Sequence, residues 1–124
     1  MSASESTALT AISFQLAAAI EAYELDVERM VAPGADPELY HRVATHMDHM
    51  RMYAASIPRI SVAWVELMIR HFELTHGLWR WLNGGDEAER ESLLQLRENQ
   101  RRAALKLREL GLQLIASGED GIAA

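Results

Sequence analysis

The residue with the clearest potential for chemistry is His71, which lies in the middle of the most apolar helical pattern of the chain. Three other polar residues, Tyr23, His46 and Gln100, take inward positions in helical patterns of their own. Imidazole, phenol and amide groups on facing helices can bind a metal ion, a haem iron or a small molecule. These four residues are our candidate ligand-binding layer, and His46 and His71 are its candidate metal ligands.

Counting residues from the predicted turns places the four side chains at one level. Tyr23 lies 11 residues before Gly34 and His46 lies 12 after it. His46 and His71 lie 12 and 13 residues on either side of Pro58, and the glutamine of the last helix falls within about one turn of the same height. A buried polar group without a partner costs roughly 1–3 kcal/mol. The layer should therefore be hydrogen-bonded internally, which we favour, or to a bound species.

Metal templates find little support in the sequence. A dinuclear site of the ferritin-like kind needs a Glu-x-x-His pair on each of two helices. The chain has one such pair, Glu73 and His76, and no second. We therefore expect no cofactor, with a metal or haem at the polar layer as the alternative.

One short stretch resembles a known catalytic motif. Residues 70–77 contain Arg70, five intervening residues, His76 and then Gly77. This stretch resembles the motif of HEPN-type ribonucleases, which are helical bundles with an Arg, four to six intervening residues and a His, often followed by Gly. The resemblance covers eight residues only, and the position after the arginine, polar in that family, is His71, which we place in the core. A HEPN-like ribonuclease is accordingly a lesser alternative.

Composition narrows the class of protein. The chain has 124 residues, 49% of them hydrophobic and 24% charged, with a net charge of −6 and no cysteine. This is the balance of one globular domain, and the acidic charge argues against general affinity for nucleic acid or anionic lipid. The first residues are Ser-rich and acidic without a basic segment, so we expect no secretory signal, and no apolar run reaches the roughly 20 residues of a membrane span. We expect a cytoplasmic protein that binds neither membrane nor nucleic acid.

The elements that position these side chains are predicted to be four helices. Breakers occur at Pro33 and Gly34, at Pro58 and at residues 83–86, and the spacing of apolar residues between them is helical throughout. The predicted helices span about 7–31, 37–56, 59–82 and 86–116, and we expect residues 117–124 to fray. Short connections make neighbouring helices antiparallel. The prediction is an all-α, up-down-up-down antiparallel four-helix bundle that forms a single domain over residues 1–124.

Charged residues follow two of these helices in stripes. The last helix holds half of the basic residues, and the end of the first helix is acidic: Arg90, Arg97, Arg101, Arg102, Lys106 and Arg108 oppose Glu21, Glu24, Asp26 and Glu28. In an antiparallel pairing the two stripes lie level and screen each other.

The chain carries more apolar surface than one small core should need. The third predicted helix is apolar around most of its circumference and holds all three tryptophans. Residues that fall off the main stripes are candidates for an interface between chains: Val65, Met68, Phe72, Trp79, Leu94, Leu105 and Leu112. We predict a homodimeric, non-enzymatic interaction protein, acting as adaptor, chaperone or regulator. A bundle that binds a metal, haem or small molecule in its polar layer is the alternative.

Overall fold

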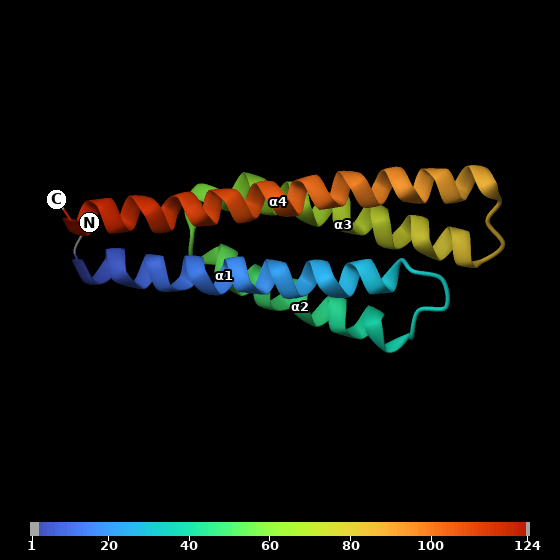
Figure 1. Ribbon diagram of the computed structural model, residues 1–124, viewed down its shortest axis with the longest axis horizontal. Helices are drawn as coiled ribbons and strands as arrows, with labels where there is room; N and C mark the ends of the chain where they lie inside the picture. The colour runs from blue at the N-terminus through green and yellow to red at the C-terminus, as the bar shows by residue number, and fades with distance from the viewer. Residues whose placement is uncertain (1–2, 124) are drawn as a thin grey trace.

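The structure is a computed structural model that describes the backbone of residues 3–123 and the side chains of residues 3–116. The chain forms α1 (Ala3–Met30), α2 (Glu38–Ala55), a 3₁₀ turn η1 (Pro58–Ile60), α3 (Ser61–Leu82) and α4 (Glu87–Ala123). Successive helices run in opposite directions, and α4 returns along α1 (Figure 1). The predicted all-α, up-down-up-down bundle is confirmed.

The turns lie where the breakers predicted them. Gly34 and Gly84 have φ angles of +72° and +95°, in the left-handed region that favours glycine at the end of a helix. Asp36 and Asp86 then each accept a hydrogen bond from a backbone N–H two or three residues further along, at 2.9 and 3.0 Å. These carboxylates satisfy amide groups that the first helical turn leaves unpaired.

The outer ends of the bundle differ from the prediction. α1 begins at Ala3 instead of near residue 7, and α4 continues to Ala123 instead of ending near 116. The backbone is thus helical up to residue 123, whereas the expected fraying of residues 117–124 stays a prediction, and residue 124 lies outside the described residues. No proline interrupts either segment, and a glycine such as Gly118 costs a helix only about 1 kcal/mol.

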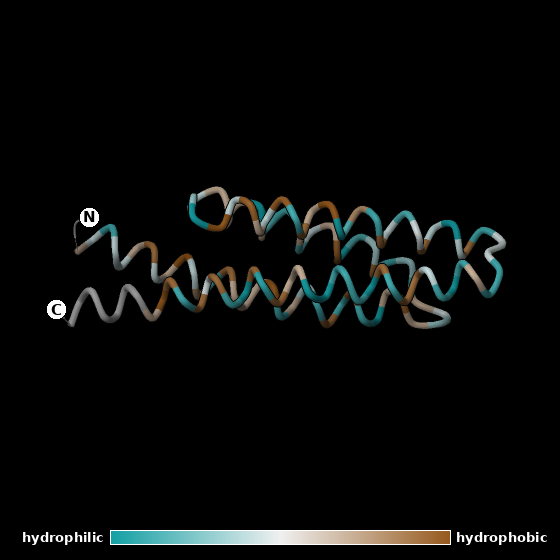
Figure 2. Tube along the Cα trace, turned by 90° about the horizontal axis from the view of Figure 1, so that it is seen from above, coloured by the Kyte–Doolittle hydropathy of each residue, from teal (hydrophilic) through white to brown (hydrophobic). Residues whose placement is uncertain are grey.

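The four helices differ in length and in how closely they pack. α1 packs against α2 and α4, and α4 packs against α1 and α3, whereas α2 and α3 touch each other far less. The beginning of α1 and the end of α4 extend past the connection between α2 and α3, so both termini lie at one end (Figure 1). Hydrophobic positions recur along every helix (Figure 2).

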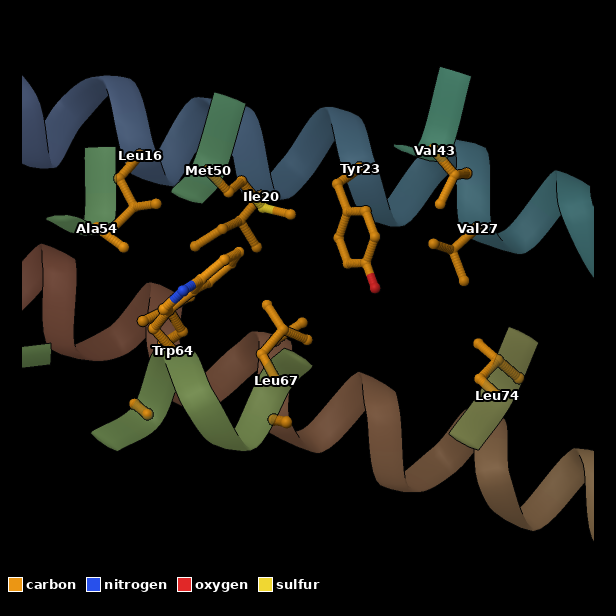
Figure 3. Close-up of a cluster of buried hydrophobic side chains, with 14 of the residues drawn as sticks. Leu16, Ile20, Tyr23, Val27, Val43, Met50, Ala54, Trp64, Leu67 and Leu74 are labelled. Atoms are coloured by element: carbon orange, nitrogen blue, oxygen red, sulfur yellow. The ribbon is translucent and has the colours of Figure 1, made fainter. Parts of the chain in front are cut away.

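The core is a continuous column of aliphatic side chains between the helices. It includes Leu16, Ile20, Val27, Val43, Met50, Leu67, Leu74 and Leu107, all nearly or fully buried. Figure 3 shows Tyr23 in the same column, with its hydroxyl pointing toward α3 and α4. Along the described residues, no helix has the length and apolarity required to cross a membrane.

Candidate functional site

Three of the four predicted layer residues meet in the core. The Tyr23 hydroxyl lies 2.8 Å from Nδ1 of His71, and Nε2 of Gln100 donates to the Tyr23 oxygen at 3.0 Å. Tyr23 and Gln100 are fully buried and His71 is 6% exposed. The residues come from α1, α3 and α4, so their hydrogen bonds tie these three helices together at one level.

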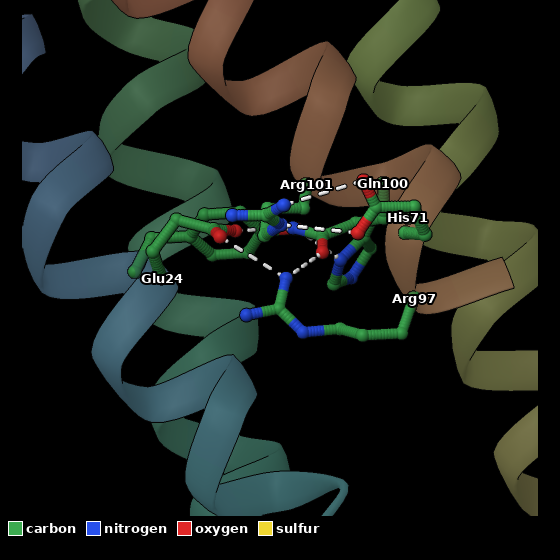
Figure 4. A network of polar contacts seen from close by, with 7 residues as sticks. Glu24, His71, Arg97, Gln100 and Arg101 are labelled. Carbon is green, nitrogen blue, oxygen red and sulfur yellow. Dashed lines mark hydrogen bonds and ion pairs between the residues drawn. The ribbon is translucent and has the colours of Figure 1, made fainter. Parts of the chain in front are cut away.

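Two charged residues that the sequence placed on the flanks complete this network (Figure 4). Nε2 of Gln100 also donates to Oε1 of Glu24 at 2.5 Å. Nη1 of Arg97 donates to Oε2 of Glu24 at 3.0 Å and to the side-chain oxygen of Gln100. Sequence position alone missed Glu24 and Arg97 because their side chains are long enough to reach inward from a flanking position. Arg97 precedes Gln100 by three residues, and this spacing was the available signal.

The two hydrogen bonds donated by Gln100 indicate how the protons of Tyr23 and His71 are arranged. Gln100 uses both amide hydrogens, one toward Tyr23 and one toward Glu24. We therefore assign the Tyr23 hydroxyl as the donor to Nδ1 of His71, with the proton of the neutral imidazole on Nε2, since this arrangement gives the buried hydroxyl hydrogen an acceptor. We call the connected set of Tyr23, Glu24, His71, Arg97 and Gln100 the polar network.

Burial favours the uncharged forms of both His71 and Tyr23. Desolvation lowers the pKa of His71 to about 4, so the imidazole is neutral near pH 7. Burial also raises the pKa of Tyr23; the hydrogen bond from Gln100 opposes this shift, and the charge of Glu24 adds to it. The two groups next to each other are thus both uncharged, and each has a partner.

His46 lies outside the polar network, contrary to the prediction. Its Nε2 pairs with Oδ2 of Asp26 at 2.8 Å. Asp26 is only 3% exposed and also forms ion pairs with Arg42 at 3.2 Å and with Arg29 at 3.5 Å. The predicted height was reasonable but the rotation was wrong, because α2 packs on α1 and barely touches α3. His46 therefore faces a carboxylate of α1.

The two candidate metal ligands thus belong to different clusters. Nδ1 of His71 accepts from Tyr23, and Nε2 of His46 is paired with Asp26. Within the part of the chain that the structure describes, no group of three or more His, Cys, Asp or Glu side chains is arranged to hold a metal ion.

The charge stripes of α1 and α4 meet as the sequence predicted. Arg108 pairs with Glu21 at 2.6 Å, and Arg97 pairs with Glu24. Asp26 turns toward α2 instead, and Arg101 and Arg102 pair with Glu98 of their own helix.

The residues of the HEPN-like motif make contacts within their own helix. Arg70 donates to Glu66 at 2.9 Å and to Glu73 at 3.0 Å. The ring of His76 stacks on Trp79, with centroids 6.3 Å apart and an interplanar angle of 16°. The two motif residues therefore have separate partners.

An apolar surface runs along the outside of α3. Its members recur at alternating spacings of three and four residues, and all are exposed: Val62, Val65, Ile69, Phe72, His76 and Trp79. This spacing is the heptad pattern by which helices pair. We call these six residues the α3 seam. On the opposite side of the same helix, Leu67 and Leu74 are fully buried in the core.

The other predicted interface residues do not all join this seam. Met68 is partly buried and packs against the core. Leu94, Leu105 and Leu112 are exposed on α4, but Arg108, which shares their side of the helix, pairs with Glu21 of α1. Their line therefore borders α1, away from the α3 seam.

A feature that the sequence did not predict is a hollow at the end where α1 and α4 extend past η1. It has a volume of about 720 Å³ and is open to solvent. Its walls are mainly apolar, and Glu5 and Arg59 are the charged residues among them. The residues that line it are Glu5, Ser6, Ala8, Leu9, Ile12, Ser56, Ile57, Pro58, Arg59 and Leu114.

Comparison with protein-family models, with curated proteins and with solved structures finds no match to this chain. The proposals below therefore depend on the geometry alone.

Proposed function

We propose that this chain is a non-enzymatic, cytoplasmic interaction protein that forms a homodimer through the α3 seam and acts as an adaptor, chaperone or regulator. The observation that carries the proposal is the seam itself: five apolar side chains follow one exposed heptad line over nearly the whole helix. Phe72 and Trp79 are 65% and 60% exposed. Aromatic side chains at such exposure are the residue types most enriched at the centres of protein interfaces.

The position of the seam supports the proposal that it is covered by a second molecule and not by the core of its own chain. α3 already buries one complete stripe, including Leu67 and Leu74, so its second stripe has no core left to cover. Contiguous apolar surface of this kind on a small protein marks a binding site or a liability to aggregate. A partner helix is the simplest cover for a surface with heptad spacing.

The polar network favours a structural role over ligand binding. Tyr23, His71 and Gln100 already satisfy one another, and Arg97 and Glu24 neutralise each other beside them. A metal ion or haem would have to displace these bonds. We therefore do not choose the alternative of a cofactor-binding bundle.

Light scattering coupled to size-exclusion chromatography tests the proposal. At tens of micromolar, the wild type should have twice the 13.9 kDa mass of one chain. Phe72→Asp should shift the mass to that of a monomer, because a carboxylate at the centre of the seam would be desolvated by dimerisation. Circular dichroism should show that the helices remain, since the side chain points away from the core.

Leu25→Asp is the matched control. Leu25 is 59% exposed on α1, close to the exposure of Phe72, and lies outside the seam. This variant should remain a dimer. A wild type of 13.9 kDa at these concentrations, or equal effects of the two substitutions, would show that the seam does not mediate association.

A further inference from the structure

We propose that the two copies pair their α3 helices in antiparallel orientation, with a two-fold axis between Ile69 and Phe72. This inference rests on the proposed dimer and adds its geometry. In such a pairing Val62 faces Trp79 of the second copy, Val65 faces His76, and Ile69 faces Phe72. Each of the six seam residues then faces another seam residue. The residue numbers in the three facing pairs add up to the same value, as a two-fold axis perpendicular to the helices requires.

Side-chain size is the first argument for this orientation. Within the seam the small valines are at the beginning of α3, and the large rings, Phe72, His76 and Trp79, are toward its end. Antiparallel pairing sets a smaller aliphatic side chain against a larger ring in every layer, so the helices can keep an even separation. Parallel pairing would set valine on valine at one end and tryptophan on tryptophan at the other, and the helices would splay apart.

His76, the one titratable residue of the α3 seam, also favours antiparallel pairing. In a parallel pair, a heptad position meets its own copy, so His76 would face His76 of the second chain. In the antiparallel pair it faces Val65 instead, and its ring remains stacked on Trp79 of its own chain. Antiparallel pairing thus avoids a contact between two imidazoles, which repel each other when protonated.

Charge at the two ends of the bundle gives an independent argument. α2 and α4 both begin at the end where α3 finishes (Figure 1). That end is rich in acidic residues, among which are Asp36, Glu38, Asp86, Glu87, Glu89 and Glu91, and they outnumber the neighbouring cations Arg29, Arg42, Arg80 and Arg90. A parallel dimer would place two such ends side by side, whereas an antiparallel dimer brings each one next to the η1 end of the other copy, where Arg59 is exposed and Arg51 pairs with Asp48 at 3.5 Å.

Cysteine cross-linking tests the orientation cleanly, because the chain has no cysteine of its own. Val65→Cys and His76→Cys are prepared separately, one with a short tag that separates the products by mass, and both are checked for helicity and dimer formation. A disulfide needs Cα atoms within about 7 Å. In the antiparallel dimer the two Val65 positions are 11 residues apart along the pair, about 16 Å at 1.5 Å per residue.

Mild oxidation of the mixed variants should therefore produce the mixed disulfide at least tenfold faster than either variant alone produces its own dimer. Arg102→Cys, at an exposed site on α4, measures the background from random collisions. Rapid cross-linking of Val65→Cys alone would overturn the proposal in favour of parallel pairing. A dimer that gives no seam cross-link above background would also overturn it, whereas a wild type that is monomeric by light scattering would refute the proposed function itself.

Discussion

Replacing His71 with glutamine should remove a large part of the pH dependence of folding stability between pH 6.5 and 4. The glutamine carbonyl can accept the hydrogen bond from Tyr23, as Nδ1 of His71 does, but it does not titrate. The substitution therefore separates the ionisation of the imidazole from its place in the polar network.

The magnitude follows from the pKa of His71, which burial lowers from 6.5 to about 4. Between these two values the unfolded chain binds a proton that the folded chain does not, so the free energy of unfolding rises with pH. The stabilisation is complete above pH 6.5 and is lost as the pH falls toward 4. Each unit of pKa difference is about 1.4 kcal/mol, so the complete loss is about 3 kcal/mol.

Urea unfolding followed by tryptophan fluorescence measures this effect, since Trp64 is buried in the core. Between pH 6.5 and 5, the wild type should lose about 2 kcal/mol more than His71→Gln. Carboxylates titrate in both proteins, so the difference between them isolates the imidazole. His49→Gln, at an exposed site, should follow the wild type. If His71→Gln and the wild type lost stability in parallel, the neutral buried imidazole inferred from the polar network would be wrong.

Three further predictions, two of them with a control substitution, are tested by the same unfolding measurement. Tyr23→Phe should cost about 3 kcal/mol, because it leaves an imidazole nitrogen and an amide hydrogen unpaired in the core; a loss below 1 kcal/mol would contradict the network. Asp26→Asn should cost about 2 kcal/mol because it removes the charge of a buried carboxylate that pairs with Arg29 and Arg42 and is hydrogen-bonded to His46, whereas Asp48→Asn, at a surface pair, should cost less than about 0.5 kcal/mol. Gly84→Ala should cost about 1–2 kcal/mol because its φ is +95°, but Gly111→Ala should be neutral or stabilising, since the added carbon meets nothing closer than 3.9 Å; equal effects would show that backbone conformation is not the cause.

The sequence predicted the fold well because its stop signals are local. Gly34 and Gly84 fix a backbone conformation that other residues adopt at a cost, and Asp36 and Asp86 cap the helices that follow. The predicted start of α1 and the predicted end of α4 were less accurate, because no residue there forbids a helix and the end point depends on packing.

The polar network shows where sequence reasoning stops. Residue counts along antiparallel helices correctly brought Tyr23, His71 and Gln100 to one height. The same counts could not show that α2 packs on α1 and turns His46 toward Asp26, because periodicity identifies the inward face of a helix but not the neighbour that the face meets. Identifying that neighbour requires the arrangement of all four helices.

The polar network also determines how α3 is rotated about its own axis. A helix with two apolar stripes could pack on the core with either one, so hydrophobic burial alone does not determine its rotation about its own axis. His71 breaks this ambiguity: it lies on the side of α3 that faces the core, where the Tyr23 hydroxyl reaches it from α1, and its ring contacts Phe72 edge-on with centroids 5.9 Å apart. Turning the α3 seam inward would carry the imidazole to the surface and leave the buried Tyr23 hydroxyl without its partner on α3. We infer that the buried polar network selects the rotation in which Leu67 and Leu74 are covered and the seam faces outward, available to a second chain.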